Sequence, residues 1–210
     1  MNETQINKRL AILMCVIFAT HLAALLYGMY AGAIMYDLGA KIFNVGNIIL
    51  ELPIIICAFL IASEKKLFRT PEARIASWVF FGFQSFNLFN MLYYCIWDNN
   101  IFGIVGPSAH IIWPVVFAGS SIWFYVSLKM WSPVKISSII SALPPIVSGI
   151  LLYQVVGKDY ADDLLPIFNA IGTTVLISAI LYAITLILSI IWALKKPLAP
   201  HVQSNPIDLI

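Results

Sequence analysis

Six long apolar segments run along this 210-residue chain and restrict its fold more than any other feature. The hydrocarbon core of a bilayer is about 30 Å thick, and a helix needs roughly 20 apolar residues to cross it. We expect spans at 10–35, 44–62, 75–97, 109–128, 136–156 and 167–194. The runs are continuous rather than alternating, which favours helices over the strands of a membrane barrel. The sequence therefore predicts an all-α, polytopic bundle of six transmembrane helices.

The composition leaves no room for a sizeable soluble domain. Of all residues, 61% are hydrophobic and only 10% are charged, whereas a soluble domain carries about 25% charged residues. We expect one transmembrane domain over residues 1–196 and a short cytoplasmic tail over residues 197–210. The net charge of +2 is too small to indicate a nucleic-acid partner, so the partner that the composition implies is the lipid bilayer.

The N-terminus resembles a secretory signal peptide, because Lys8 and Arg9 precede an apolar run. The apolar part of a cleavable signal is about 7–15 residues long. Here the run from Leu10 to Tyr36 is much longer. We therefore interpret it as an uncleaved first span.

The distribution of basic residues predicts the orientation, because Lys and Arg gather on the cytoplasmic side of a membrane protein. Six spans divide the 12 basic residues into ten on one side and two on the other. The richer side holds Lys8, Arg9, Lys65, Lys66, Arg69, Arg74, Lys129, Lys135, Lys195 and Lys196, and the poorer side holds Lys41 and Lys158. Both termini are thus expected in the cytoplasm, with the chain in the plasma (inner) membrane.

Glu51 is the sharpest polar feature of the apolar segments. It lies seven residues into the second span, roughly 10 Å from the outer boundary at about 1.5 Å per residue. An acidic side chain at that depth costs about 2.5–3.5 kcal/mol on insertion and is usually functional. Asn47 precedes it by one turn on the same helical face, and Pro53 follows and frees a backbone carbonyl.

Polar side chains of the first and third spans fall at a similar depth. His21 lies near the middle of the first span, and Gln84 and Asn87 lie three residues apart in the third. We expect Glu51, His21, Asn47, Gln84 and Asn87 to line one substrate or proton pathway. Burial and neighbouring charges readily shift the proton affinities of Glu and His, so the two could pass protons. The alternative is a protonated Glu51 whose hydrogen bonds only hold helices together.

Prolines are expected to break or hinge two spans, at Pro53 in the second and at Pro144 and Pro145 in the fifth. Two halves of three spans would run in opposite directions, as in transporters built from inverted repeats. Small polar residues at helical spacing favour a packing seam between the fifth and sixth spans. The first half is therefore expected to hold the working residues and the second half to serve as scaffold.

No motif indicates a metal or a particular cofactor. Cys15, Cys57 and Cys95 are scattered through apolar runs at no metal-like or redox-like spacing. The sequence contains no Gly-rich phosphate loop and no zinc-protease helix motif. We therefore expect no metal-binding residues, and the sequence does not identify a cofactor.

Three functions are compatible with these features. The favoured one is a transporter or channel for a small solute or ion, with proton coupling through Glu51. The alternative is a non-catalytic subunit of a larger membrane complex, or a homo-oligomer, because large apolar residues cover every span. An enzyme acting on lipids or quinones comes third, because no spacing of a nucleophile and a base supports it.

Overall fold

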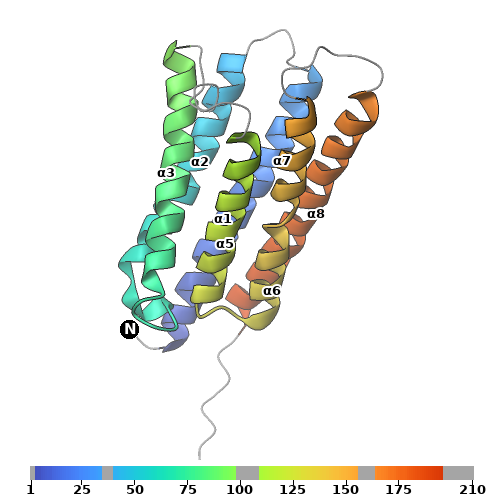
Figure 1. Cartoon of the computed structure of the whole chain (residues 1–210). Coiled ribbons are helices and arrows are strands. Elements are labelled where there is room, and N and C mark those ends of the chain that lie inside the picture. Colours follow the sequence, from blue (N-terminus) through green and yellow to red (C-terminus); the bar gives the residue numbers. More distant parts are fainter. Residues whose placement is uncertain (1–2, 35–39, 98–108, 156–163, 196–210) are drawn as a thin grey trace, which may run out of the picture.

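The structure, a computed structural model, describes residues 3–34, 40–97, 109–155 and 164–195 (Figure 1). The helices are α1 (Glu3–Ile34), α2 (Ala40–Ser63), η1 (Lys65–Leu67), α3 (Arg74–Trp97), α5 (Ala109–Ser127), α6 (Ser132–Ser141), α7 (Pro144–Val155) and α8 (Leu165–Leu194). Within these ranges there is no strand, and extended pairing is limited to one isolated bridge between Phe68 and Leu128. The all-α prediction is confirmed, while the expected tail at 197–210 lies outside the described residues.

Four helical segments are long and apolar enough to cross a membrane, which indicates a membrane-embedded protein. They are Gln5–Tyr30, Val45–Ser63, Ser132–Gln154 and Leu165–Leu194. In α5 the apolar stretch, Ile111–Ser127, is shorter. The helix α3 is not among the four because serine, glutamine and asparagine residues interrupt its row of aromatic residues.

The fifth predicted span, 136–156, is two helices rather than one. Ala142 and Leu143 separate α6 from α7, and their amides donate to Ile139 and Ile140 in bonds of 3.2 Å. A proline ring fits the first turn of a helix but clashes with a preceding turn, which explains why α7 begins at Pro144. In contrast, α2 continues without interruption through Pro53.

The helices form a closed ring in chain order (Figure 1). The helix α2 packs between α1 and α3, α3 packs on α5, and α5 packs on α6 and α7. The last helix, α8, packs on both α6 and α7 and returns to α1. Phe18, Phe80 and Phe124 are fully buried in the core. Phe80 and Phe124 stack with centroids 4.4 Å apart and ring planes only 2° from parallel.

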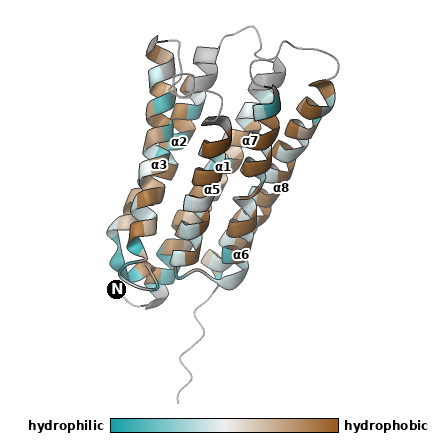
Figure 2. Cartoon of the chain, in the orientation of Figure 1, coloured by the Kyte–Doolittle hydropathy of each residue, from teal (hydrophilic) through white to brown (hydrophobic). Residues whose placement is uncertain are grey.

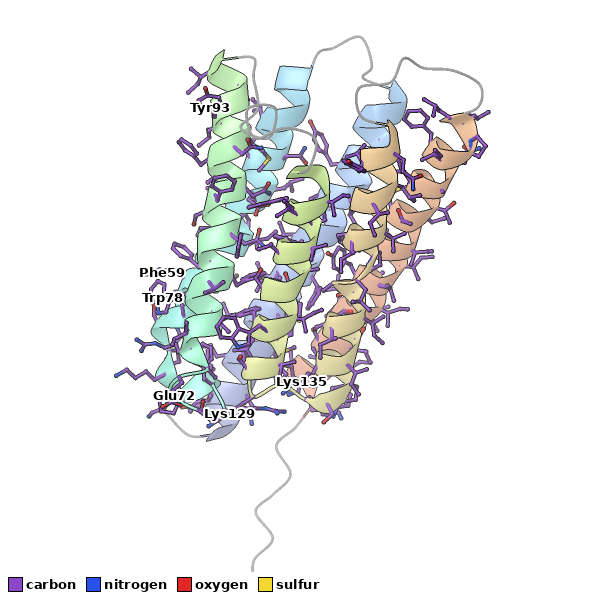
Figure 3. The ribbon with its side chains drawn as sticks, in the orientation of Figure 1. Phe59, Glu72, Trp78, Tyr93, Lys129 and Lys135 are labelled. Carbon is purple, nitrogen blue, oxygen red and sulfur yellow. The ribbon has the colours of Figure 1, made fainter. Side chains whose placement is uncertain are left out.

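The outer surface of the bundle is apolar, and small polar side chains lie inside. Figure 2 shows hydrophobic colours along most of the helices and hydrophilic colours at the end near the N-terminus. Phe59 and Trp78 point away from the bundle (Figure 3), and 48% of Phe59 is exposed. The buried serine and threonine residues are Thr20, Ser77, Ser120, Ser121, Ser127, Ser138, Ser141, Ser178, Thr185 and Ser189. Lipid-facing bundles have this pattern, because small polar residues allow close helix packing and an apolar exterior meets hydrocarbon.

A hydroxyl seam joins the fifth and sixth predicted spans, as the sequence indicates. Ser137 of α6 forms a hydrogen bond with Thr185 of α8, and Ser148 of α7 forms one with Thr174 of α8. Because α6 and α7 each have one such bond, α8 holds both pieces of the broken span.

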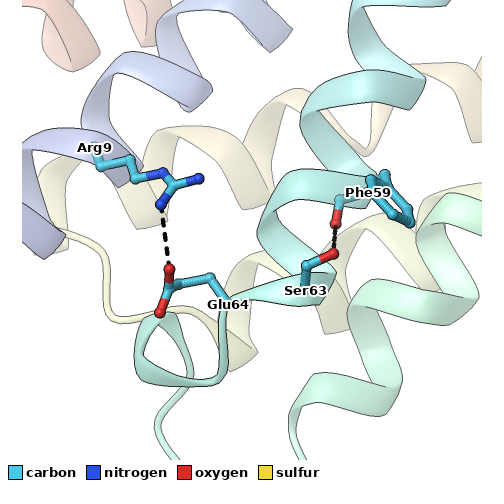
Figure 4. A network of polar contacts seen from close by, with 4 residues as sticks. All are labelled: Arg9, Phe59, Ser63 and Glu64. Carbon is cyan, nitrogen blue, oxygen red and sulfur yellow. Dashed lines mark hydrogen bonds and ion pairs between the residues drawn. The ribbon is translucent and has the colours of Figure 1, made fainter.

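The connection between α2 and α3 and the connection between α5 and α6 are joined by hydrogen bonds at the end of the bundle where the chain begins. Together they form what we call the cap. The Arg69 amide donates to the Ser127 carbonyl at 3.1 Å, and the Lys129 amide donates to the Leu67 carbonyl at 2.9 Å. Arg9 joins α1 to this cap through an ion pair with Glu64 at 3.2 Å (Figure 4). That pair is partly exposed, so it contributes little stability.

Lys135 anchors the same cap from inside. Although sequence analysis counted it only as a loop charge, its side chain is 8% exposed. Its Nζ donates to the Leu128 carbonyl at 2.8 Å and to the Val126 carbonyl at 3.5 Å. The last carbonyls of a helix lack intrahelical donors and carry partial negative charge. Lys135 therefore caps the C-terminus of α5 from the first turn of α6 (Figure 3).

Substitution of Lys135 by methionine is expected to lower the free energy of unfolding by about 2 kcal/mol, because hydrogen bonds from a charged donor to buried carbonyls are lost. Thermal unfolding in mild detergent, followed by circular dichroism, measures the loss. Lys129→Met is the matched control, since the Lys129 side chain is exposed and only its backbone joins the cap. Equal melting temperatures for both variants would contradict the capping role.

Candidate functional site

Glu51 lies inside the bundle on the face of α2 that meets α3. Only 8% of the residue is exposed. The Asn87 side chain of α3 forms a hydrogen bond with the Glu51 carboxyl group. The other carboxyl oxygen, Oε1, is buried and has no hydrogen-bond partner among the described residues. The carboxyl group therefore interacts with one neighbouring amide and leaves one buried oxygen unsatisfied.

Two more unsatisfied polar atoms lie on the inner face of α3. Gln84 is 1% exposed and Ser77 is fully buried, and neither Gln84 Nε2 nor Ser77 Oγ has a partner in the described part of the chain. Residues 77, 84 and 87 are spaced by whole helical turns, so they share one face with Phe80. A buried polar atom without a partner costs about 1–3 kcal/mol and calls for an explanation such as a bound water molecule or ion. The seam between α2 and α3 is thus a place where a small polar species would gain hydrogen bonds.

His21 of α1 is partly buried in the bundle beside Tyr182 of α8. Its Nδ1 lies 2.9 Å from the Ile17 carbonyl. A carbonyl can only accept, so Nδ1 carries a proton and Nε2 of a neutral ring is left as an acceptor. The His21 ring lies 5.2 Å from the Tyr182 ring and 6.4 Å from the Phe18 ring, measured between centroids.

Two tyrosines that sequence reasoning missed complete the surroundings of Glu51. Tyr182 of α8 is 8% exposed and interacts electrostatically with Glu51. Tyr125 of α5 is 3% exposed and interacts in the same way with Tyr182. The Phe18 ring lies 5.8 Å from Tyr125 and 5.9 Å from Tyr182. Sequence reasoning gave Tyr125 and Tyr182 no role in the site, since the sequence of one helix does not show which ring interacts with an acid on another.

The predicted residues are brought together to different degrees. Glu51, Gln84 and Asn87 share the seam between α2 and α3, and His21 reaches it by way of Tyr182. Asn47 is partly buried one turn before Glu51.

The prolines lie in different settings. Pro53 lies two residues beyond Glu51 within the continuous helix α2. Pro144 and Pro145 instead begin α7, which packs on α5 and α8, the helices that carry Tyr125 and Tyr182. The second half of the chain therefore packs its broken span against the two helices that carry these tyrosines.

The chemistry open to this group is proton binding and polar recognition. Glu51 is an acid whose free oxygen can hold a proton or face a positive charge. Gln84 and Asn87 offer both donors and acceptors, and the tyrosines offer hydroxyl groups and ring faces. Among the described residues, no three His, Cys, Asp or Glu side chains are grouped so that they could hold a metal ion.

The bond between Asn87 and Glu51 can be tested by a double-mutant cycle. Asn87→Leu is expected to lower the free energy of unfolding by about 1–3 kcal/mol, because it leaves the buried carboxyl group without its donor. Adding Glu51→Met should restore much of that loss, since both polar groups are then gone. Thermal unfolding of the four proteins in detergent measures the interaction energy. Purely additive losses would show that the two side chains do not interact.

Comparison with known proteins assigns no role to these residues. No protein-family model, no curated protein and no solved structure matches the chain. The roles of Glu51, Gln84 and Asn87 rest on their own geometry in the bundle.

Proposed function

We propose that the protein is a small multi-pass membrane transporter that moves a small solute or ion, with Glu51 as the group that couples this movement to protons. The observation that carries the proposal is the buried Glu51 Oε1 atom, which has no partner among the described residues although Asn87 interacts with the same carboxyl group. Most buried side-chain polar atoms have a partner, so an unpartnered oxygen is unusual in a carboxyl group that only holds helices together.

The physical basis of coupling is competition at this oxygen. A protonated Glu51 is neutral, which suits an apolar interior. Loss of the proton leaves a negative charge whose burial is costly unless a polar or charged group takes the vacated position. Proton and solute thus compete for the same carboxyl oxygen. This competition links the binding of one to the release of the other, which is what a coupled transporter needs.

Movement of the bundle is the second requirement of transport. The break at Ala142 and Leu143 divides one span into two rigid pieces, and α7 packs on the same two helices that carry Tyr125 and Tyr182. Helices interrupted by proline at mid-span are common where transporters open and close. We assign the hinge to this break, so that a tilt of α7 relative to α6 changes access to Glu51.

The transporter has six spans with both termini in the cytoplasm, the two shorter or less apolar helices α3 and α5 being spans as well. Two features support this topology. The helix α1 begins and α8 ends at the same end of the bundle (Figure 1). The cap at that end carries exposed Lys65, Lys66, Arg69 and Lys129.

The topology predicts which single cysteines react from outside. In a variant lacking the three native cysteines, Lys41→Cys and Lys158→Cys should react in intact cells with a membrane-impermeant maleimide. Lys66→Cys and Lys129→Cys should react only after the membrane is permeabilised. External labelling of Lys66→Cys at the rate of Lys158→Cys would rule out cytoplasmic termini.

Transport is tested by solute-driven proton flux in proteoliposomes that contain a pH-sensitive dye. We expect at least one member of a panel of cationic, neutral and anionic solutes to drive proton flux through the wild-type protein. Glu51→Gln should lower that flux at least about tenfold, which corresponds to about 1.4 kcal/mol of lost interaction. The matched control is Glu64→Gln, because Glu64 belongs to the partly exposed pair at the cap. It should retain the flux.

Folding of both variants is checked by their melting curves in detergent. Equal flux through Glu51→Gln and the wild-type protein would reject Glu51 as the coupling group. A wild-type protein without solute-driven flux that co-purifies with fixed partners would replace transport by the role of a complex subunit.

A further inference from the structure

The negative charge that Glu51 acquires on losing its proton has no internal counterion in the described part of the chain. The ion pair recorded there joins Arg9 and Glu64 at the cap. Lys135 is buried, but its ammonium group is occupied by the carbonyls at the end of α5. The groups that do act on Glu51 are the neutral side chains of Asn87 and Tyr182. A cation that replaces the proton must therefore come from outside the protein.

A group of aromatic rings packs together in the interior, and one of them, Tyr182, interacts electrostatically with this acid. Tyr182 interacts with Glu51, and the rings of His21 and Phe18 lie 5.2 Å and 5.9 Å from Tyr182. Tyr125 extends the group, with its ring 5.8 Å from Phe18. The faces of aromatic rings carry partial negative charge and attract cations, Lys, Arg and quaternary ammonium groups among them. Three helices, α1, α5 and α8, thus contribute cation-attracting rings, and Tyr182 links this group electrostatically to the carboxyl group of α2.

The available ligands distinguish an organic cation from a small inorganic one. Calcium takes six to eight oxygen ligands, and magnesium needs a near-ideal octahedron. Around Glu51 the structure offers one free carboxyl oxygen and the amide groups of Gln84 and Asn87, with aromatic rings instead of further carboxylates. Gln84 has an unfilled amide nitrogen, which suits a substrate that carries a second polar group. This mixture of one acid, amides and rings matches a charged nitrogen attached to an apolar body.

We infer that the transported solute is an organic ammonium ion, whose positive charge takes the position of the proton at Glu51 and whose apolar part packs against Tyr182 and Phe18. As the ion arrives, Glu51 releases its proton to water, so one positive charge replaces another. This inference rests on the proposed transport function and names its substrate class. It also gives Tyr182 a role in recognition.

Binding to the wild-type protein in lipid nanodiscs provides the first test. The probes are 2-phenylethylammonium and its neutral counterpart 2-phenylethanol, which share the same ring and chain length, together with sodium ions. Calorimetry in buffers with different ionisation enthalpies counts the protons released. The ammonium ion should bind at least about tenfold more tightly than the alcohol, the equivalent of about 1.4 kcal/mol, and should release protons. Equal binding of the alcohol, or displacement of the ammonium ion by equimolar sodium, would overturn the inference.

Variants locate the binding site. Glu51→Gln should weaken ammonium binding and abolish proton release. Tyr182→Leu should weaken binding at least about threefold, because the cation–π interaction with the ring is lost. Tyr182→Phe keeps the ring face and should bind within about twofold of the wild-type protein. The control Tyr153→Leu alters a tyrosine of α7 that is 45% exposed, and it should change nothing. Unchanged affinity in Tyr182→Leu would contradict the assigned role of this ring.

The comparison of the two phenylethyl probes needs no variant, so the inference remains testable if Tyr182→Leu does not fold. The solute panel in proteoliposomes separates the two proposals. Proton flux driven only by neutral or anionic solutes would reject the ammonium ion and leave transport standing. Absence of flux with every solute, despite ammonium binding and proton release, would reject transport and leave the cation site standing.

Discussion

Surrounding hydrocarbon is the constraint on which the rest of this structure depends, because polar groups must find their partners inside the protein. The helices satisfy their own backbones, and many serine and threonine side chains donate to carbonyls in their own helix, as Ser138 does to Val134 and Ser189 to Thr185. The cap is held by backbone bonds and by Lys135. The buried side-chain atoms of Glu51, Gln84 and Ser77 that have no hydrogen-bond partner are exceptions to this pattern within the described residues. All three belong to α2 and α3, where the described residues leave buried polar atoms unpaired.

The sequence predicts the helices well because their signal is local. Apolar length defines a span and helical spacing defines a face, so the shared face of Gln84 and Asn87 follows from the sequence alone. Which face meets which neighbour is a tertiary property that no single helix encodes. The proximity of Tyr182 to Glu51 therefore escaped prediction. Lys135 escaped for the same reason, since its partners are carbonyls at the end of another helix.

The prolines show how context decides the effect of one residue type. Pro53 lies within a continuous α2, whereas Pro144 and Pro145 start a new helix after a break. Proline therefore breaks a span in the second half of the chain but not in the first, so the prolines do not make the two halves alike. The first half supplies the acid and the amides, and the second supplies tyrosines and a jointed span. Under the proposed transport function, such an arrangement would assign recognition to both halves and the hinge to the second.

The stacked rings of Phe80 and Phe124 have a further consequence for the membrane itself. On the inner face of α3, Phe80 lies between Ser77 and Gln84, which are about 10 Å apart along the helix at about 1.5 Å per residue. Two fully buried rings at that point interrupt the row of polar groups with a layer that cannot hydrogen-bond to water. A continuous chain of hydrogen-bonded water along α3, which could conduct protons, would be interrupted at this layer. In a membrane, such a layer would separate the polar groups on its two sides, so that an acid inside the bundle need not open a continuous polar path across it.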